Sequence, residues 1–286
     1  MQSRFAFLPH RSILALKGPD TLALLERLIT CNTKDWSEGE ARYGALLAPQ
    51  GKILADFLAI RVEDGVLLDV HGDALPDLAK RLKLFRLRAS VEIEPLERQI
   101  IVTSMEPAEH GLRPVSGAYR VYIDPRYEGG RLRAIAHEAE WRQYHGHEAE
   151  WSVPVSEYHA DRIASCVPEF GEDFETASVF PADVNMDRLG GVDYKKGCFV
   201  GQEVVSRMYR RGGVRKRTVL LEKAGCAPGD PVAPAEGASI GKVTSATEHQ
   251  ALAVLRLDRL AKLDTRLDMI GPEWAFEEMN SVAAND

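Results

Sequence analysis

This sequence lacks the signals of several common protein classes. No apolar run approaches the ~20 residues that a helix needs to span a bilayer. The N-terminal stretch MQSRFAFLPHRSILAL has neither the apolar core nor the small-residue cleavage site of a secretory signal. There is also no G-x-G-x-x-G fingerprint for binding a dinucleotide. These absences predict a cytoplasmic protein without a Rossmann fold.

Cysteine is scarce, and positive charge is not in excess. Only four cysteines occur, and none of them stands in a C-x-x-C pair or at the spacing of a zinc finger. They are therefore expected to be reduced thiols. The formal net charge is −7, so the overall field does not favour nucleic acid, although the basic stretch RMYRRGGVRKR could hold an anion.

The residues that are present predict a soluble α+β protein of two or three domains. With 286 residues, 45% of them hydrophobic and 28% charged, the chain is long enough for more than one core. An apolar stripe after Gly18 and Pro19 predicts a helix to Thr30, and apolar positions after Asp73 predict a second helix. Strand-like runs separated by turn residues occupy 41–48, 53–62, 66–71, 91–93 and 99–104. Helices that alternate with antiparallel hairpins indicate an α+β domain rather than a doubly wound parallel sheet.

The second half of the chain predicts two further helices and a small β domain. Pro154 permits a helix through Cys166, and Gly201 suits the N-cap of another helix that ends at Arg210 and Arg211. Short alternating runs at 218–222, 238–247 and 251–257 indicate a β-barrel or sandwich. The last fifteen residues are expected to be disordered.

The pentapeptide HEAEW occurs twice, at 137–141 and 147–151. Its histidines and glutamates could ligate a metal ion. In a helix, however, ten residues turn the chain by about 1000°, which places the two copies on different faces. Because charged stretches usually face water, the sequence favours a solvated surface, and no metal site is expected.

The stretch KKGCFVGQE surrounds Cys198 with groups that could activate a thiol. Two lysines, at 195 and 196, precede the cysteine, and the helix expected after Gly201 follows it. Cations and a helix N-terminus favour the thiolate and lower a cysteine pKa below its free value of about 8.5. The alternative is that Cys198 is a small core residue, which Phe199 and Val200 would carry into the interior. The local residues leave both interpretations open.

A second unusual position is Asp56, in the strand-like run ILADFLAIRV. Strict alternation places its carboxylate on the same face as Leu54 and Leu58. A buried carboxylate without partners is costly, so Asp56 must be paired, hydrogen-bonded or held for a ligand. An ion pair with Arg or Lys, or a position at the open end of the strand, would explain it without a ligand. A ligand with N–H donors, such as a pterin, would satisfy the carboxylate directly.

With these residues in view, the chain resembles the YgfZ proteins, which are relatives of the glycine-cleavage T-protein (aminomethyltransferase) family. Residues 196–203 match the YgfZ pattern K-G-C-[aromatic]-x-G-Q-E at all seven specified positions. Further similarity lies in LERLITCNTKDW, ALLAPQGKILADF, DRIASCVPEFGEDF, FPADVN and GKVTSA. The resemblance therefore covers nearly the whole chain.

This resemblance implies a ring of two α+β domains and a small C-terminal β-barrel around a central opening that binds tetrahydrofolate. Asp56 falls where the family places an aspartate that contacts folate. Arg207 and Arg211, in a cationic neighbourhood with Arg210 and Arg215, suit the glutamate tail of folate, and a solvated helix face is the alternative for each of them. The expected divisions are an N-terminal folate-binding domain at 1–110, a domain with the cysteine motif at 111–213, the barrel at 214–272 and a tail at 273–286. The first boundary is approximate, since the two α+β domains can intertwine there.

The resemblance also implies a function. YgfZ proteins support the maturation or repair of iron–sulfur enzymes, including a tRNA methylthiolating enzyme, in a folate-dependent way. The chain is accordingly expected to act with iron–sulfur assembly factors and [4Fe–4S] client enzymes, through a reactive thiol at Cys198 with Lys196, Gln202 and Glu203 beside it. No direct contact with nucleic acid or with a membrane is expected.

Two other functions stay open at this point. One is a tetrahydrofolate-dependent aminomethyltransferase or methyltransferase. True aminomethyltransferases have a glutamate after R-[LM], whereas this chain has Ala164 after Arg162 and Ile163, and alanine cannot accept hydrogen bonds from a pterin. The other is a non-catalytic interaction scaffold in which Cys198 only fills space. Turnover of a classical kind is not expected, but the sequence leaves it undecided.

Overall fold

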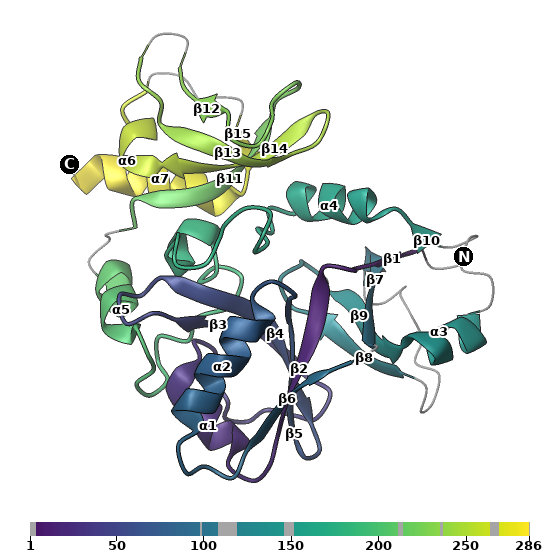
Figure 1. The fold of residues 1–286 in the computed structure, drawn as a ribbon. Helices are drawn as coiled ribbons and strands as arrows, with labels where there is room; N and C mark the ends of the chain where they lie inside the picture. Colours follow the sequence, from purple (N-terminus) through teal and green to yellow (C-terminus); the bar gives the residue numbers. More distant parts are fainter. Residues whose placement is uncertain are drawn as a thin grey trace.

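The computed structural model describes residues 4–97, 99–107, 119–145, 152–210, 214–234, 237–263 and 269–285. Within these ranges the chain forms three five-stranded sheets. Two of the sheets and their helices make up the lower body in Figure 1, and the third sheet lies above them. This arrangement confirms the α+β class that the sequence predicts.

The first sheet is antiparallel and is built from residues 11–96. Its strands follow the order β3 (Ala41–Leu47), β4 (Ile53–Val62), β5 (Gly65–His71), β2 (Arg11–Lys17) and β6 (Glu92–Leu96). Helices α1 (Thr21–Leu28) and α2 (Leu75–Arg86) contact this sheet and cover one of its faces (Figure 1). The predicted helices and strands of this segment are confirmed, and β4 has the predicted bounds.

Strand β4 is buried from Ile53 to Ile60, so neither of its faces meets solvent there. Buried leucines of α1 and α2 belong to the same hydrophobic core as this strand, among them Leu24, Leu28 and Leu82. The second sheet packs over the first through contacts of β7 with β2 and of β8 with β3. A side chain on β4 is therefore enclosed whichever way it points.

The strands of the second sheet lie both before and after residues 11–96 in the sequence. Its order is β10 (Ser152–Val153), β1 (Phe5–Phe7), β7 (Gln99–Pro107), β9 (Arg131–His137) and β8 (Tyr119–Asp124), and only the β1–β10 pair among them is parallel. Residue 110, the expected boundary between two domains, lies outside the described residues, and the strands before and after it in the sequence, β7 and β8, belong to the same sheet. Helix α3 (Glu138–His145) follows β9 and contains the end of the first HEAEW copy, whereas the second copy lies outside the described residues.

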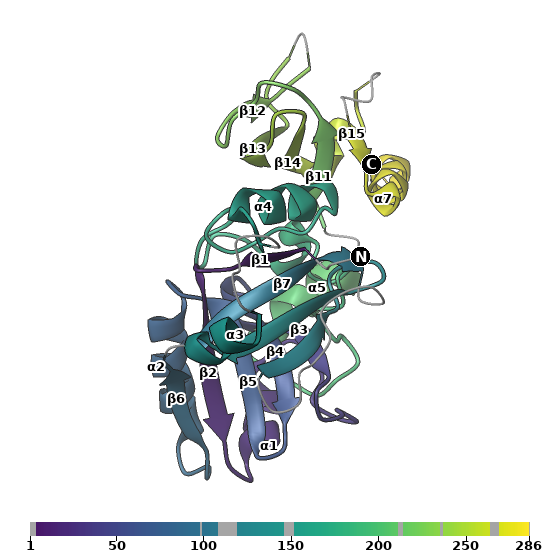
Figure 2. The same ribbon diagram turned by 90° about the vertical axis from the view of Figure 1, so that its right-hand side faces the viewer.

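Residues 154–210 lead from the second sheet to the C-terminal domain. Helix α4 (Val155–Ala164) contacts β13 and β14 and lies between the third sheet and the lower body (Figure 2). A short 3-10 helix, η3 (Pro181–Val184), contacts β11, and α5 (Gln202–Arg210) follows the cysteine motif. Both helices that the sequence predicts in this part of the chain are confirmed.

The third sheet is antiparallel and belongs to the C-terminal domain. Its order is β12 (Pro231–Val232), β13 (Gly241–Ala246), β14 (Gln250–Arg256), β11 (Lys216–Glu222) and β15 (Met269–Gly271). The short helix α6 (Leu257–Leu260) follows β14. Val219, Val243 and Leu255 are fully buried in the core of this domain, which agrees with the small β domain expected from the alternating runs.

The expectation of a disordered C-terminal tail is wrong. Residues Glu273–Asn285 form helix α7, and Ala275 is fully buried in the core of the third sheet, with Met279 packed beside it. These two residues are four positions apart, so they share one face of the helix. Glu278 of α7 also forms an ion pair with Arg217 of β11 at 2.7 Å. None of the helices in the described ranges has the length and apolar character to cross a membrane.

Candidate functional site

The cysteine motif forms a loop that is anchored by a buried lysine. The Nζ atom of Lys196 donates hydrogen bonds to the carbonyl oxygens of Ile29 at 3.0 Å and Cys31 at 2.7 Å. It also lies 3.3 Å from Oε2 of Glu26, and the side chain of Lys196 is 0% exposed. Burial lowers the pKa of Lys196, and the charge of Glu26 opposes this effect. Lys196 therefore ties the loop to the C-terminal end of α1.

Two other motif residues fix the path of the loop. Phe199 is buried in the main core, and Nζ of Lys196 lies 5.6 Å from the centre of its ring. Gly201 has a φ of +79°, and a Cβ there would stand 2.6 Å from the carbonyl oxygen of Ala48 in the β3–β4 turn. Glycine alone tolerates both the left-handed backbone and this close approach. The loop is thus held against the turn that leads into β4.

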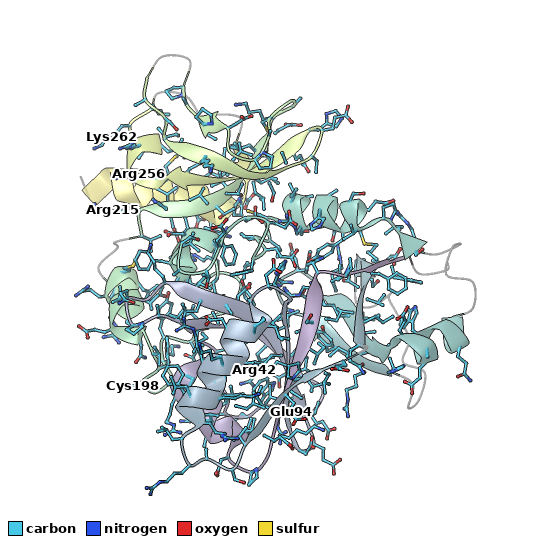
Figure 3. All side chains as sticks on the ribbon, viewed as in Figure 1. Arg42, Glu94, Cys198, Arg215, Arg256 and Lys262 are labelled. Atoms are coloured by element: carbon cyan, nitrogen blue, oxygen red, sulfur yellow. The ribbon has the colours of Figure 1, made fainter. Side chains whose placement is uncertain are left out.

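Cys198 lies on the exposed part of this loop. Figure 3 shows it at the side of the molecule, near α5. The interpretation of Cys198 as a core residue is therefore wrong, because its neighbour Phe199 takes the buried position. Gln202 donates from Nε2 to the carbonyl oxygen of Gly197 at 3.4 Å, and Glu203 is exposed in the first turn of α5. An accessible thiol on an anchored loop can reach a carbon, a metal ion or a thiol of another molecule.

The two arginines expected to hold the tail of folate are not both placed by the structure. Arg207 is exposed on α5, and Arg211 lies outside the described residues. Nearby, Tyr209 of α5 stacks on Tyr194, with ring centroids 4.0 Å apart and an interplanar angle of 13°. This stack holds α5 to the segment just before the motif. The role of the two arginines stays a prediction.

Asp56 is buried, as the strand alternation predicts, and is 1% exposed. Its Oδ2 accepts a hydrogen bond from the Tyr43 hydroxyl at 2.9 Å, while its Oδ1 is enclosed and has no hydrogen-bond partner among the described residues. Burial raises the pKa of Asp56, and the charges of Arg11 and Arg126 oppose the rise. The carboxylate therefore keeps one acceptor atom unused in the interior.

A cleft of about 680 Å³ lies beside Tyr43. Strand β3, the β8–β9 loop and the segment before the motif form its walls, which include Arg42, Tyr43, Arg126, Tyr127, Arg188 and Asp193. Oδ1 of Asp193 accepts the backbone N–H groups of Lys195 at 2.7 Å and Lys196 at 3.1 Å. The cleft wall is therefore continuous with the motif loop on one side and with the hydrogen-bond partner of Asp56 on the other.

The positive groups of this cleft are held by neighbouring carboxylates. Arg126 lies over the Tyr43 ring, 5.3 Å from its centre, and forms an ion pair with Asp124 at 2.7 Å. Asp56 itself does not line the cleft. A ligand that enters the cleft thus meets Tyr43 and Arg126 before it meets Asp56.

Sequence reasoning missed a layer of buried charges between the first and second sheets. Asp69 of β5 accepts hydrogen bonds from Arg11 at 2.7 Å, Arg133 at 2.8 Å and the Tyr122 hydroxyl at 2.7 Å. Although burial alone would raise the pKa of Asp69, the two arginines hold it below its usual range. The available signal was the one used for Asp56, since Asp69 stands among apolar residues in GVLLDVH.

Arg162 belongs to a neighbouring buried network and joins α4 to the third sheet. Its guanidinium donates to Asp173 at 2.5 Å and to the Ser245 hydroxyl of β13 at 2.9 Å. Ala164, where the aminomethyltransferases have their glutamate, is exposed at the end of the same helix. The α4 segment thus contributes to the contact with the C-terminal domain through Arg162.

The architecture is that of the glycine-cleavage aminomethyltransferases, with a β-barrel domain at the C-terminus. The structure is similar to the glycine cleavage system aminomethyltransferase T from Bartonella henselae, with a TM-score of 0.71 over 89% of this chain and 78% of that one. The sequence identity is 16%, so this likeness concerns the fold. Residues 215–276 match the model of the CAF17 C-terminal β-barrel domain.

Sequence relatives narrow this class to one family. The chain is 30% identical over 305 residues to the mitochondrial iron–sulfur cluster assembly factor IBA57 homologue of Mycosarcoma maydis, covering 91% of this chain and 75% of the relative. It is 28% identical over 284 residues to mitochondrial IBA57 of Homo sapiens, covering 88% and 77%. The chain belongs to the IBA57 family of iron–sulfur cluster assembly factors.

These relatives also correct an expectation drawn from the sequence. They are named as mitochondrial proteins, as is IBA57 of Mus musculus, and the predicted cytoplasmic location is therefore wrong. The relatives belong to the IBA57 family, and the YgfZ proteins that the motif resembles form a related family.

Proposed function

We propose that this protein acts in the assembly of iron–sulfur clusters and that the thiol of Cys198 is its working group. Membership in the IBA57 family supports the part of the proposal that concerns iron–sulfur cluster assembly. One structural observation supports the choice of Cys198 as the working group. Its side chain is exposed on a loop that Lys196, Phe199 and Gly201 hold in place.

The other three cysteines are less suited to this role. Cys31 and Cys166 are buried, and burial raises the pKa of each to about 12, so both stay protonated at neutral pH. Cys226 is half-buried in the C-terminal domain, where its thiol contacts the carbonyl oxygen of Lys223. Iron is bound by thiolates, and a single cysteine cannot hold a cluster alone. We therefore infer that other ligands come from an assembly factor or from a [4Fe–4S] client enzyme.

The proposal includes a tetrahydrofolate site at the cleft beside Tyr43. Its support is the unused, enclosed Oδ1 of Asp56, which suits the N–H donors of a pterin. Tyr43 lines the cleft and donates to the same carboxylate, so a folate that reaches Asp56 requires the Tyr43 side chain to turn aside. Among the arginines of the cleft wall, Arg188 suits the carboxylates of the folate tail best, because its side chain stays 43% exposed beside its partner Glu278. When bound, tetrahydrofolate would supply a carrier for one-carbon groups.

The role of the thiol is tested in cells that lack their own member of the family. Cys198→Ala should fail to restore the activity of [4Fe–4S] enzymes while its melting temperature stays unchanged, because the side chain is exposed. Cys226→Ala, which also removes one thiol, should restore activity. Full activity with Cys198→Ala would support the scaffold alternative and contradict the proposal.

The folate site is tested by calorimetric titration of tetrahydrofolate into the purified protein. Asp56→Asn should weaken binding by about tenfold to a hundredfold, as expected when a hydrogen bond to a charged acceptor is lost. Asp258→Asn, which changes a carboxylate paired with Arg256 in the C-terminal domain, should bind like wild type. Equal affinity of wild type and Asp56→Asn would remove folate from the proposal and leave the role of Cys198 standing.

A further inference from the structure

The end of helix α2 carries an exposed segment in which cationic and apolar residues are interleaved. Residues 83–88 read K-L-F-R-L-R, and all six are exposed. Leu84 is 71% exposed, Phe85 is 36% exposed and Leu87 is 81% exposed. Single exposed leucines are common on proteins, but three large apolar side chains within four residues form a patch that needs a reason.

The fold does not explain these side chains. The core face of α2 is made by other residues, Leu78, Ala79 and Leu82. Leu87 ends the helix with a φ of +50°, a left-handed conformation that favours glycine. Leucine does not relieve the backbone strain at this position, and its side chain does not pack in the core. We therefore infer that the side chain serves a contact with another molecule.

The same segment is positive within an acidic protein. Lys83, Arg86 and Arg88 contribute three cations, and no acidic residue lies between 83 and 88, whereas the whole chain has a net charge of −7. Earlier in α2, Asp77 is already paired with Arg81 at 2.5 Å. The acidic residues across the following turn are Glu92 and Glu94 of β6. The segment therefore favours an anionic surface with an apolar layer.

We propose that the 83–88 segment rests on an anionic lipid membrane, with Leu84, Phe85 and Leu87 in the interface and the cations of Lys83 and Arg88 against lipid phosphates. The third cation, Arg86, donates a hydrogen bond to the carbonyl oxygen of Val91 at 3.0 Å. A second copy of this chain would bring like charges together, which disfavours self-association through this segment. A protein partner would need a groove shaped for protruding side chains, whereas a bilayer interface accepts them without such a groove. The protein would lie on the membrane rather than cross it. This contact departs from the expectation, based on the absence of a spanning run, that no membrane is involved.

The contributions of charge and of apolar contact are measurable. A basic residue near an anionic surface strengthens binding by about fivefold. Reversing two of the cations should therefore weaken binding by about 25-fold or more. Replacing Leu84 and Leu87 by serine should weaken it by about tenfold or more, because two side chains no longer enter the apolar layer.

The experiment is co-sedimentation of the full chain with vesicles. Wild type should bind vesicles of phosphatidylcholine and phosphatidylglycerol in equal parts, release from them as salt is raised, and not bind vesicles of phosphatidylcholine alone. The double variants Leu84→Ser with Leu87→Ser, and Lys83→Glu with Arg88→Glu, should lose binding. Lys34→Glu with Lys242→Glu makes the same change in net charge at two exposed positions elsewhere and should keep it. Ile123→Ser, at a residue that is 50% exposed on β8, is the matched apolar control.

Leu87→Gly separates a contact with lipid from a role in the fold. It should weaken vesicle binding and at the same time raise the melting temperature, because glycine suits the left-handed backbone at this position. Failure of wild type to bind the anionic vesicles would overturn the proposal. Equal losses in the 83–88 variants and in their controls would overturn it too, as would a dimer in light scattering that Leu84→Ser with Leu87→Ser dissociates.

Discussion

Replacing Lys196 by methionine tests whether the motif lysine anchors the loop. The change removes the ammonium but keeps a long apolar side chain, so the carbonyl oxygens of Ile29 and Cys31 lose their donor inside the protein. A buried polar group without a partner costs about 1–3 kcal/mol. Glu26 is less affected, because it still accepts hydrogen bonds from the backbone and hydroxyl of Thr33.

The two carbonyls together give a loss of about 2–6 kcal/mol in the free energy of unfolding. Part of it is offset, because burial disfavours the charge of Lys196, as the lowered pKa shows, and methionine gains by being buried. We therefore expect Lys196→Met to reduce the free energy of unfolding by about 2–4 kcal/mol.

Urea unfolding at neutral pH, followed by circular dichroism, measures this loss. The matched control is Lys195→Met, since the side chain of Lys195 is exposed. Its free energy of unfolding should stay within about 0.5 kcal/mol of wild type. Equal free energies of unfolding for Lys196→Met and Lys195→Met would refute the anchoring role. They would leave activation of the Cys198 thiol as the role of Lys196.

Three further predictions concern other parts of the molecule. Because burial raises the pKa of Asp56 above its ordinary 3.8, the folded state binds more protons than the unfolded state between the two values, so wild-type stability should fall as the pH rises through this interval. In urea unfolding from acidic to neutral pH, Asp56→Asn should not show this fall in stability. Parallel plots of the free energy of unfolding against pH for wild type and Asp56→Asn would contradict the raised pKa of Asp56. Gly201→Ala should lose about 2–4 kcal/mol in the same assay, whereas Gly197→Ala, where an added Cβ meets nothing within 4 Å, should lose less than about 1 kcal/mol. Deleting 273–285 should lower the melting temperature of the C-terminal domain, since α7 buries Ala275 there; an unchanged temperature would mean that the helix does not pack.

Local patterns were sufficient where the environment of a residue is set by its own strand or helix. The run ILADFLAIRV predicted β4 with its observed bounds. Its apolar residues also indicated that Asp56 is buried, although in the structure other elements cover both faces of the strand. The apolar stripes of α1 and α2 likewise predicted both helices. In each case the residues that decide the structure are within a few positions of one another.

Local patterns were insufficient where a distant contact decides. The sequence places Lys196 two positions from Cys198 and suggested that it activates the thiol, yet its ammonium binds the carbonyl oxygen of Ile29, 167 positions away. The C-terminal helix was missed for a related reason. Ala275 and Met279 are weak signals by themselves and become meaningful only against the core of the third sheet. The pairing partners of Asp69, which come from three other strands, are equally invisible in its own strand.

The mixed origin of the second sheet bears on the order in which the protein forms during its synthesis. The first sheet uses only residues 11–96 and is complete as soon as they have left the ribosome. The strand at Phe5–Phe7 precedes all of these residues, but its neighbours are Gln99–Pro107 and Ser152–Val153, which both come after the first sheet in the sequence. Its edge toward Ser152–Val153 stays open until more than half of the chain has been made. Contacts between such distant segments form slowly. The strand at Phe5–Phe7 is therefore paired only after the first sheet is complete, and its two phenylalanines stay uncovered in the meantime.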